Sequence, residues 1–325
     1  MSGSLVTGGQ GFIGGHLVRA LVERGEDVTV LDLPGAPGRA LEIHGLVGEV
    51  RLIEGDVADP TVVHRALRES ASDGSGPDSV FHLAAQTLVG PAAEDPATTF
   101  RSNVEGTWVL LEGCRASDVE AVVVASSDKA YGPSESLPYR ESYELRPAAP
   151  YEASKSAADV ISRSYWPAFG LPVAVTRLAN VYGGGDLNRS RLVPEAAMAC
   201  LRGTPPQIRS DGSPERDYLH VSDAVAAYLA VEGAVREGAG RGEAFNAGTG
   251  EAWPVRTIVD LIADEAAREG VGLTEAEYLG EGVPEGEIDR QLVDATRLTE
   301  LTGWSPKVTL GAGLTEAVEW YRSHA

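Results

Sequence analysis

The chain has few cysteines and a shortage of basic residues, and each shortage excludes a class of protein. Its 325 residues include two cysteines, Cys114 and Cys200, which lie far apart in apolar surroundings. Two such residues make neither a disulfide framework nor a zinc site, so we expect buried, reduced thiols and no metal. Lysine and arginine number 27 against 48 aspartates and glutamates, which gives a formal net charge of -21. This acidity argues against nucleic acid as a partner, because phosphates must be neutralised by basic side chains.

Long hydrophobic runs are also missing. No apolar stretch reaches the length needed to span a membrane. Residues Met1–Ser4 lead directly into a strand and lack the basic and apolar segments of a signal peptide. The sequence therefore predicts a cytoplasmic protein with no membrane partner. Its length and its 43% of hydrophobic residues are sufficient for two modest domains with a packed core.

A glycine-rich segment near the N-terminus predicts a binding site for a dinucleotide. The short strand Leu5–Val6 ends at Thr7-Gly-Gly-Gln-Gly-Phe-Ile-Gly14, after which apolar residues recur at helical spacing. Glycines allow a tight turn and let a pyrophosphate approach the free N–H groups at the start of a helix. The residues that we expect to contact the cofactor in this segment are Gly8, Gly11, Phe12, Ile13 and Gly14.

Acidic residues follow the next two predicted strands. Asp32 ends the strand Asp27–Leu31, at about the spacing of the acid that binds the adenosine ribose hydroxyls. A carboxylate there repels the 2'-phosphate of NADP, so the sequence favours NAD. The strand Val50–Ile53 leads to Asp56 and Val57. Either Asp56 accepts from the adenine amino group while Val57 packs on the ring, or Asp56 caps the next helix.

The fourth predicted strand, Ser79–Leu83, opens into small residues. Leu83, Ala84 and Ala85 let a cofactor lie close to the backbone, and Gln86 follows near the switch point where ligands bind. Strands and helices alternate throughout this part of the chain. The alternation predicts an α/β fold with a doubly wound parallel sheet, the Rossmann arrangement.

The densest group of reactive side chains follows the apolar strand Ala121–Ala125. Tyr151 and Lys155 are four residues apart in helix-favouring sequence, so both lie on one helical face. The ammonium of Lys155 favours a phenolate and is expected to lower the pKa of Tyr151. Ser126 or Ser127 at the strand end can share a hydrogen bond with Tyr151, and the group can then take a proton from a substrate alcohol. A partly exposed helix pair without chemistry is the alternative.

The alternating pattern breaks after Tyr182. Gly183–Asp186 is expected to be a flexible joint, and residues 183–216 and 250–325 a smaller C-terminal α/β lobe that binds substrate. Residues 1–182 and 217–249 then form the NAD-binding domain. Predicted helices near 98–116 and 151–169 carry enough apolar surface to pair with their copies, so we expect a homodimer.

Three further polar residues have two readings each. Arg216 and Arg290 suit a substrate diphosphate, because arginine presents a planar donor fork to phosphate oxygens. Surface ion pairs with the abundant carboxylates explain the two arginines equally well. Asn103, on the helix near 98–116, is either a polar core residue or a support for the active site.

Placed together, these segments resemble the extended short-chain dehydrogenases that act on nucleotide sugars, over essentially the whole chain. The resemblance is carried by Thr7–Gly14, His82-Leu-Ala-Ala-Gln86, Tyr151-Glu-Ala-Ser-Lys155, Arg177-Leu-Ala-Asn-Val-Tyr-Gly183, Arg216-Asp-Tyr218 and Gly303-Trp-Ser-Pro306. It implies tight binding of NAD and oxidation of a sugar hydroxyl, usually at C4, with later return of the hydride. It implies cofactor contacts from Ser126, Tyr151 and Lys155, and substrate contacts from Gln86, Ser127, Asn180, Arg191, Leu192, Arg216 and Arg290.

Asp128 and Lys129 separate two reactions within that group. A 4-epimerase needs only oxidation, rotation of the keto sugar and reduction. A 4,6-dehydratase also removes the C5 proton and protonates the departing C6 hydroxyl, for which Lys129 suits the base and Asp128 the acid. The order Ser127-Asp-Lys is similar to that of CDP-glucose 4,6-dehydratases, which oxidise C4, lose water across C5 and C6, and return hydride to C6.

Two observations weigh against that reading. Tyr131-Gly132 after the acid and base is typical of epimerases, which act on UDP-hexoses or UDP-uronic acids. Asp128 and Lys129 can also be a solvated turn pair or a helix cap. The sequence therefore favours a nucleotide-sugar 4,6-dehydratase and keeps a 4-epimerase as the alternative.

Overall fold

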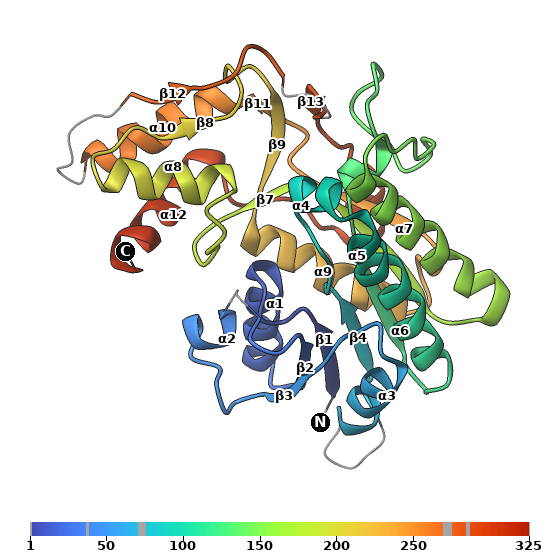
Figure 1. The fold of residues 1–325 in the computed structure, drawn as a ribbon. Helices are drawn as coiled ribbons and strands as arrows, with labels where there is room; N and C mark the ends of the chain where they lie inside the picture. The colour runs from blue at the N-terminus through green and yellow to red at the C-terminus, as the bar shows by residue number, and fades with distance from the viewer. Residues whose placement is uncertain (1, 37–38, 71–75, 269–274, 284–286, 325) are drawn as a thin grey trace.

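The computed structural model describes residues 2–36, 39–70, 76–268, 275–283 and 287–324. Within these residues, a seven-stranded sheet forms the centre, in the order β10-β6-β5-β4-β1-β2-β3 (Figure 1). Each neighbouring pair in it runs parallel. The strands are β1 (Gly3–Thr7), β2 (Asp27–Asp32), β3 (Arg51–Glu54), β4 (Ser79–His82), β5 (Ala121–Ser127), β6 (Val173–Leu178) and β10 (Ala244–Ala247). The predicted doubly wound sheet is confirmed.

Helices cover both faces of this sheet. One face packs on α1 (Phe12–Glu23) and α9 (Val221–Arg236), and the other on α3 (Pro60–Glu69), α6 (Gly106–Arg115) and α7 (Pro150–Phe169). Successive residues of β5 alternate between these two layers: Val123 lies in the first core, and Val122 and Val124 lie in the second. A strand that is buried on both faces needs apolar residues at every position, which explains its valine run.

The helix predicted near 98–116 is interrupted. The structure has α5 (Pro96–Phe100), a π-helical turn η1 (Arg101–Glu105) and then α6. Asn103 in this turn accepts from the backbone N–H of Gln86 at 2.7 Å and donates to Ser154 Oγ at 2.8 Å. A π-turn adds a residue to a helix and re-aims its side chains, so the interruption lets Asn103 reach both partners.

A second group of helices forms the lobe. Its core contains side chains of α8 (Leu192–Leu201), α10 (Val255–Arg268) and α12 (Leu310–His324). Strand β9 (Glu215–His220) links the lobe to the sheet, because it pairs with three strands and leads directly into α9. Its partners are β7 (Asn180–Tyr182), β11 (Ala252–Pro254) and β13 (Arg290–Gln291), while β8 (Gln207–Ile208) pairs with β12 (Glu277–Tyr278).

The segment that contains α11 (Thr296–Thr302) returns to the sheet. Leu298 and Trp304 lie in the same core as α1 and α9, and the Trp304 indole N–H donates to the carbonyl of Asp223 at 3.2 Å. Part of the segment 250–325, which the sequence assigned to the lobe, therefore packs on α9. The domain boundaries themselves stay a prediction.

Two expectations from the composition can be compared with the structure. Cys114 and Cys200 are free and buried, as predicted. Burial raises the pKa of the Cys200 thiol to about 11, so this side chain is inert at neutral pH. None of the described helices combines the length and the hydropathy that crossing a membrane requires.

Candidate active site

The glycine-rich loop connects β1 to α1 at the carboxyl end of the sheet. Gly8 has a positive φ of 75°, and a Cβ built on it would lie 2.7 Å from the backbone nitrogen of Ala84. A Cβ on Gly14 would lie 2.1 Å from the carbonyl oxygen of Gly8, so the first turn of α1 packs directly on the loop. Gly11 is the N-cap of α1 and offers no side-chain hydrogen bond to the helix. The N–H groups at the start of α1, including those of Phe12 and Ile13, are therefore available to an anion.

Asp32 lies at the end of β2 beside this loop. Its carboxylate accepts from the backbone N–H groups of Gln10 and Leu33, both at 2.8 Å. Burial is the largest effect on this carboxyl and raises its pKa. Asp32 therefore fixes the loop while lying where the ribose of a dinucleotide is expected.

Asp56 and Val57 follow β3. Asp56 accepts from the N–H of Ala58 at 2.9 Å and pairs with Arg101 at 3.2 Å. The helix-capping alternative for Asp56 is wrong, because Asp59 is the N-cap of α3. Val57 is 7% exposed and packs in the second core of the sheet.

The end of β4 is held by a buried hydrogen-bonded chain. His82 contacts Thr7 Oγ1 at 2.7 Å through Nδ1 and Thr107 Oγ1 at 3.0 Å through Nε2. Burial lowers the pKa of His82 to about 3, so the ring is neutral. Thr7 also accepts from the N–H of Ala84, and the backbone of Leu83 and Ala84 lies against Gly8 of the loop.

Gln86, predicted to contact substrate, has local partners for its side chain. Its amide donates to Leu88 O at 2.9 Å and to Thr99 Oγ1 at 3.3 Å. Its backbone N–H and carbonyl are both bonded by Asn103. Asn103 is thus a buried polar residue that holds the backbone of Gln86, a predicted substrate contact.

Ser126 and Ser127 end β5, directly opposite the start of α7. The hydroxyl of Ser126 is buried and has no hydrogen-bond partner among the described residues. Ser127 forms a hydrogen bond with Tyr151 that lowers the phenol pKa. Lys155 donates to the carbonyl of Ala125 at 2.9 Å. The structure therefore brings the serine, tyrosine and lysine together.

Burial decides the ionisation of this group. It raises the pKa of Tyr151 to about 12, and the Ser127 hydrogen bond only partly opposes it. Burial also lowers the pKa of Lys155 to about 8. The expectation that Lys155 lowers the pKa of Tyr151 below its usual value is wrong in this structure, because desolvation of the phenolate is the larger effect.

Asp128 and Lys129 form the first half of a 3-10 turn, η2 (Asp128–Tyr131), after β5. Asp128 is 1% exposed, which contradicts the alternative of a solvated turn. Its Oδ1 accepts from Ser127 Oγ at 3.2 Å, and its Oδ2 is buried without a partner among the described residues. Ser127, which accepts from the N–H of Lys129, is the cap of this turn.

The candidate acid, Asp128, and the candidate base, Lys129, have opposite pKa shifts. Burial raises the pKa of Asp128, although the charge of Lys129 opposes the shift. Burial lowers the pKa of Lys129, although the charge of Asp128 opposes that shift in turn. Both side chains are therefore shifted toward their neutral forms, a carboxylic acid and an amine.

The two candidate phosphate-binding arginines differ in their surroundings. Arg216 is 6% exposed, donates to the carbonyls of Glu215 and Asp289 at 2.9 Å, and pairs with Glu287 at 3.3 Å. The side chain of Arg290 is 56% exposed and pairs with Glu215 at 2.8 Å. In this structure Arg290 matches the surface ion-pair reading, and Arg216 faces the charges of Asp128 and Lys129.

Other predicted substrate contacts come from the start of the lobe. Arg191, the residue before α8, pairs with Asp186 at 2.9 Å and donates to Thr87 Oγ1 at 3.1 Å. Its charge also acts on Tyr151, so it lies near the catalytic group. Leu192 begins α8 and packs against the lobe core, and Asn180 begins β7 opposite Tyr218.

Gln291 is a site residue that the sequence analysis missed. It is fully buried, and its Oε1 accepts from Lys129 Nζ at 2.9 Å. The only signal in the sequence is a neutral polar residue beside the apolar pair Leu292 and Val293. A separation of 162 residues hides the contact with Lys129 from any local pattern.

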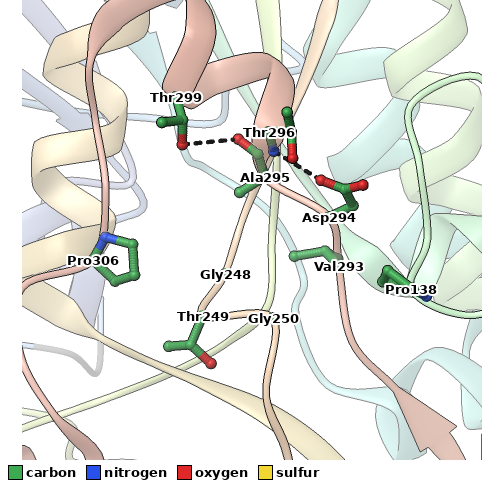
Figure 2. Close-up of a pocket in the computed structure, with 10 residues that line it drawn as sticks. All are labelled: Pro138, Gly248, Thr249, Gly250, Val293, Asp294, Ala295, Thr296, Thr299 and Pro306. Carbon is green, nitrogen blue, oxygen red and sulfur yellow. Dashed lines mark hydrogen bonds between the residues drawn. The ribbon is translucent and has the colours of Figure 1, made fainter.

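Two cavities flank this region without containing its catalytic group. The first cavity has a volume of about 360 Å³. Figure 2 shows its lining, in which Gly248, Thr249 and Gly250 face the start of α11. None of the predicted site residues lines it. The other, of about 550 Å³, lies between residues 133–137 and 288–290 and includes Arg290. The candidate site is therefore described by the residues at the strand ends.

The residues at the strand ends fit a dinucleotide. The glycine loop leaves no room for a Cβ at Gly8 or Gly14, the first N–H groups of α1 lack a side-chain cap, and Asp32 stands at the end of β2. The unpartnered hydroxyl of Ser126 lies beyond, at the end of β5. Together with Tyr151 and Lys155, they define an enzyme of the dinucleotide-dependent class that acts on hydroxyl groups.

Comparison with known proteins gives the family. Residues 4–248 match the NAD dependent epimerase/dehydratase family, to which the chain belongs. A dTDP-glucose 4,6-dehydratase of Xanthomonas campestris pv. campestris (strain B100) is 32% identical over 98% of this chain and 92% of its own. A UDP-glucose 4-epimerase of Mycolicibacterium smegmatis is 33% identical over 98% of each chain.

The fold is also similar to solved structures of this family. A dTDP-glucose 4,6-dehydratase of Bacillus anthracis in complex with NAD has a TM-score of 0.85 and 26% identity, over 99% of this chain and 97% of that one. The predicted cofactor, NAD, and the predicted membership of the nucleotide-sugar epimerase and dehydratase group are confirmed. The chain is thus an enzyme of the NAD-dependent epimerase and dehydratase family.

Proposed function

We propose that this protein is an NAD-dependent nucleotide-sugar 4,6-dehydratase, which converts CDP-glucose or a related NDP-hexose to the 4-keto-6-deoxy sugar. The observation that carries the proposal is the adjacent pair of buried Asp128 and half-buried Lys129, next to Ser127 and Tyr151. Oxidation at C4 alone does not require a second acid and base, whereas loss of water across C5 and C6 requires both.

The catalytic group would act first at C4. Ser127 would polarise the C4 hydroxyl, and Tyr151 would take its proton as the phenolate, the form that burial disfavours by raising the pKa to about 12. Lys155 is held in place by the carbonyl of Ala125. Bound NAD supplies the exchange of hydride with C4 and, later, with C6 of the sugar. The resulting 4-keto group makes the C5 proton acidic.

Elimination then falls to Lys129 and Asp128. The lowered pKa shifts Lys129 toward the neutral amine, the form that can accept the C5 proton. The raised pKa shifts Asp128 toward the carboxylic acid, the form that can protonate the C6 oxygen as water leaves. Two adjacent groups with opposite pKa shifts are what an acid and a base in one site require.

Binding residues are proposed on the same basis. NAD would contact the glycine loop, the ends of β2 to β5 and the catalytic pair through Gly8, Gly11, Phe12, Ile13, Gly14, Asp32, Asp56, Val57, Leu83, Ala84, Ala85, Ser126, Tyr151 and Lys155. The sugar nucleotide would contact Gln86, Ser127, Asn180, Arg191, Leu192 and Arg216, and Arg290 once it exchanges Glu215 for a phosphate oxygen.

A 4-epimerase is the second candidate, supported by the epimerase of M. smegmatis over nearly the full length of both chains. The sequence Tyr131-Gly132 no longer favours it. Gly132 has a φ of 71° and its Cβ would lie 1.9 Å from the carbonyl oxygen of Arg146. Tyr131 accepts from Arg177 at 2.8 Å and donates to Asn246 at 2.7 Å. Tyr131 and Gly132 therefore have structural roles in this turn, and these roles do not distinguish an epimerase from a dehydratase.

We also propose a homodimer through the outer faces of α6 and α7, in the cytoplasm. Trp108 on α6 and Val160 and Phe169 on α7 are 45%, 52% and 56% exposed. Large apolar side chains on adjacent helices are typical of a surface that another chain covers. Light scattering that finds only monomer at micromolar concentration would contradict the dimer.

The test of the reaction is a panel of CDP-glucose, dTDP-glucose, UDP-glucose and GDP-mannose. Mass spectrometry after incubation separates the two candidates, because a dehydratase product has lost one water and an epimerase product keeps its mass. The substrate should also raise the melting temperature, since it binds the folded state. Absence of a 4-keto-6-deoxy product from every sugar in the panel would refute the dehydratase.

A further inference from the structure

The amine of Lys129 is held by a residue of the distant strand β13. Gln291 accepts from Lys129 Nζ at 2.9 Å, and its side chain is fully buried. Strand β13 pairs with β9 in a register that sets Gln291 beside Arg216. The contact thus joins the turn after the central sheet to the small sheet of the lobe.

We propose that Gln291 is a positioning residue for Lys129, which it holds against the substrate through its amide carbonyl. The inference rests on the dehydratase proposed above, in which Lys129 takes the C5 proton. Gln291 acts through Lys129 and takes no proton itself.

An uncharged acceptor suits this purpose. An amide carbonyl accepts an N–H from Lys129 in both its amine and its ammonium form, so it orients the side chain in either state and favours the ammonium less than a carboxylate would. A carboxylate in the same place would favour the ammonium, which cannot accept a proton. Gln291 Nε2 is buried and has no partner among the described residues, so the side chain leaves a donor unsatisfied while it holds Lys129.

Four charged groups act on the pKa of Lys129. They belong to Asp128 in η2, Arg216 in β9, Glu152 in α7 and Glu287 before β13. Burial remains the largest influence and favours the neutral amine. Because Gln291 adds no charge to this set, its replacement by glutamate changes one charge at a known position.

The first test measures Lys129 directly. The chain contains three lysines, Lys129, Lys155 and Lys307, so acetylation by acetic anhydride is assigned to each by peptide mass spectrometry. Lys307 is exposed and gives the internal reference. In Gln291→Glu, the pH at which Lys129 is half reactive should rise by roughly 1–3 units, because an opposite charge lies in contact.

Gln207→Glu is the matched control. It adds the same charge to an exposed side chain of β8, which pairs with β12 and not with the site. The half-reactive pH of Lys129 should not move in this variant. An unmoved value in Gln291→Glu as well would overturn the proposed contact, whatever reaction the enzyme catalyses.

The second test follows the reaction. In the pH profile of kcat for water loss, the pH at which the rate falls on the acidic side should be higher in Gln291→Glu. It should rise together with the pH at which Lys129 is half acetylated. If the pH of half acetylation rises and the pH profile of kcat does not move, the contact is structural and the positioning role is wrong. If the wild type forms no dehydrated product, the dehydratase fails and the catalytic purpose of the contact fails with it, even where the pH of half acetylation rises.

Gln291→Met keeps the test decisive if the glutamate variant does not fold. Methionine keeps the length of the side chain and removes the acceptor, so Lys129 loses its orientation but gains no charge. A misplaced catalytic group lowers turnover by up to about 100-fold, and KM should change little because Gln291 does not bind the substrate in this proposal. Unchanged kcat in Gln291→Met, with NAD retained, would overturn the proposal.

Discussion

Replacing Asp128 by asparagine removes the proposed acid and also the charge that acts on the pKa of Lys129. The two side chains have nearly the same shape, and Asp128 is 1% exposed with one hydrogen bond, to Ser127. Asparagine can still accept that hydrogen bond. It has no acidic proton to give to the C6 oxygen, so water loss reports the role of the acid, and proton exchange at C5 reports any effect on Lys129.

The size of the effect follows from general acid catalysis, which contributes about 10²–10⁴ in rate. At about 1.4 kcal/mol for each factor of ten, the barrier to water loss should rise by about 3–5 kcal/mol. Stability should respond differently. Because burial raises the folded pKa of Asp128 above its unfolded value, ionisation costs stability as the pH rises past the unfolded pKa. The asparagine variant has no such cost, so its unfolding free energy at neutral pH should equal or exceed that of the wild type.

The assay separates the two halves of the elimination. Incubation in D2O with the preferred sugar nucleotide reports exchange at C5, which depends on Lys129, and mass spectrometry reports loss of water, which depends on Asp128. In Asp128→Asn we expect exchange to continue while water loss falls. Asp118→Asn is the matched control, since this exposed residue precedes β5 at the opposite end of the strand from Ser127.

An unchanged rate of water loss in Asp128→Asn would refute the assignment of the acid. Loss of both exchange and water loss, with a lowered melting temperature, would instead mean that Asp128 holds the turn together. Neither result affects the membership of the family, which rests on the match of residues 4–248.

Three further predictions concern cofactor binding and stability. Gly14→Ala should lower the free energy of unfolding by about 1–3 kcal/mol and weaken NAD binding measured by calorimetry. The new Cβ would lie 2.1 Å from the carbonyl oxygen of Gly8. Gly90→Ala is the control and should have neither effect, because a Cβ there has no heavy atom within 4 Å. Asp159→Asn should lower the free energy of unfolding in urea by about 3–5 kcal/mol, because a buried charge loses its partner. Arg177 is 1% exposed and contacts the Asp159 carboxylate at 2.8 and 2.9 Å. A loss below about 1 kcal/mol would contradict a structural ion pair. Burial lowers the pKa of His16 from 6.5 to about 4, so the melting temperature should be highest above pH 6.5 and fall toward pH 4 as the unfolded chain binds the proton; the fall should be smaller in His16→Asn.

Much of the fold could be predicted because it depends on local patterns. Apolar strands separated by helices give a parallel sheet, and β5 and α7 lie almost where the sequence placed them. The π-turn at Arg101–Glu105 was not predicted, since it depends on contacts of Asn103 with Gln86 and Ser154, which are far away in the chain. The return of Trp304 to the core beside α9 is hidden for the same reason.

The candidate site shows the same division. Helical spacing correctly places Tyr151 and Lys155 on one face of α7, and the strand end brings Ser127 to them. The burial of these side chains could not be predicted from the sequence. Burial raises the pKa of Tyr151, whereas the sequence analysis expected Lys155 to lower it. Gln291 was missed because its partner, Lys129, lies 162 residues earlier.

The way in which the lobe is attached limits how this enzyme can open. The chain passes between sheet and lobe at β7, at β9, after β10 and again before α12. Asp223, at the start of α9, accepts from the N–H groups of Lys307 and Val308, and the backbone N–H of Tyr139 donates to the carbonyl of Leu292. A lobe anchored along several chain segments cannot swing on a single glycine joint as a hinged domain does. We therefore expect substrate to enter by rearrangement of side chains such as Arg191 and Arg290, with the two bodies remaining docked throughout the catalytic cycle.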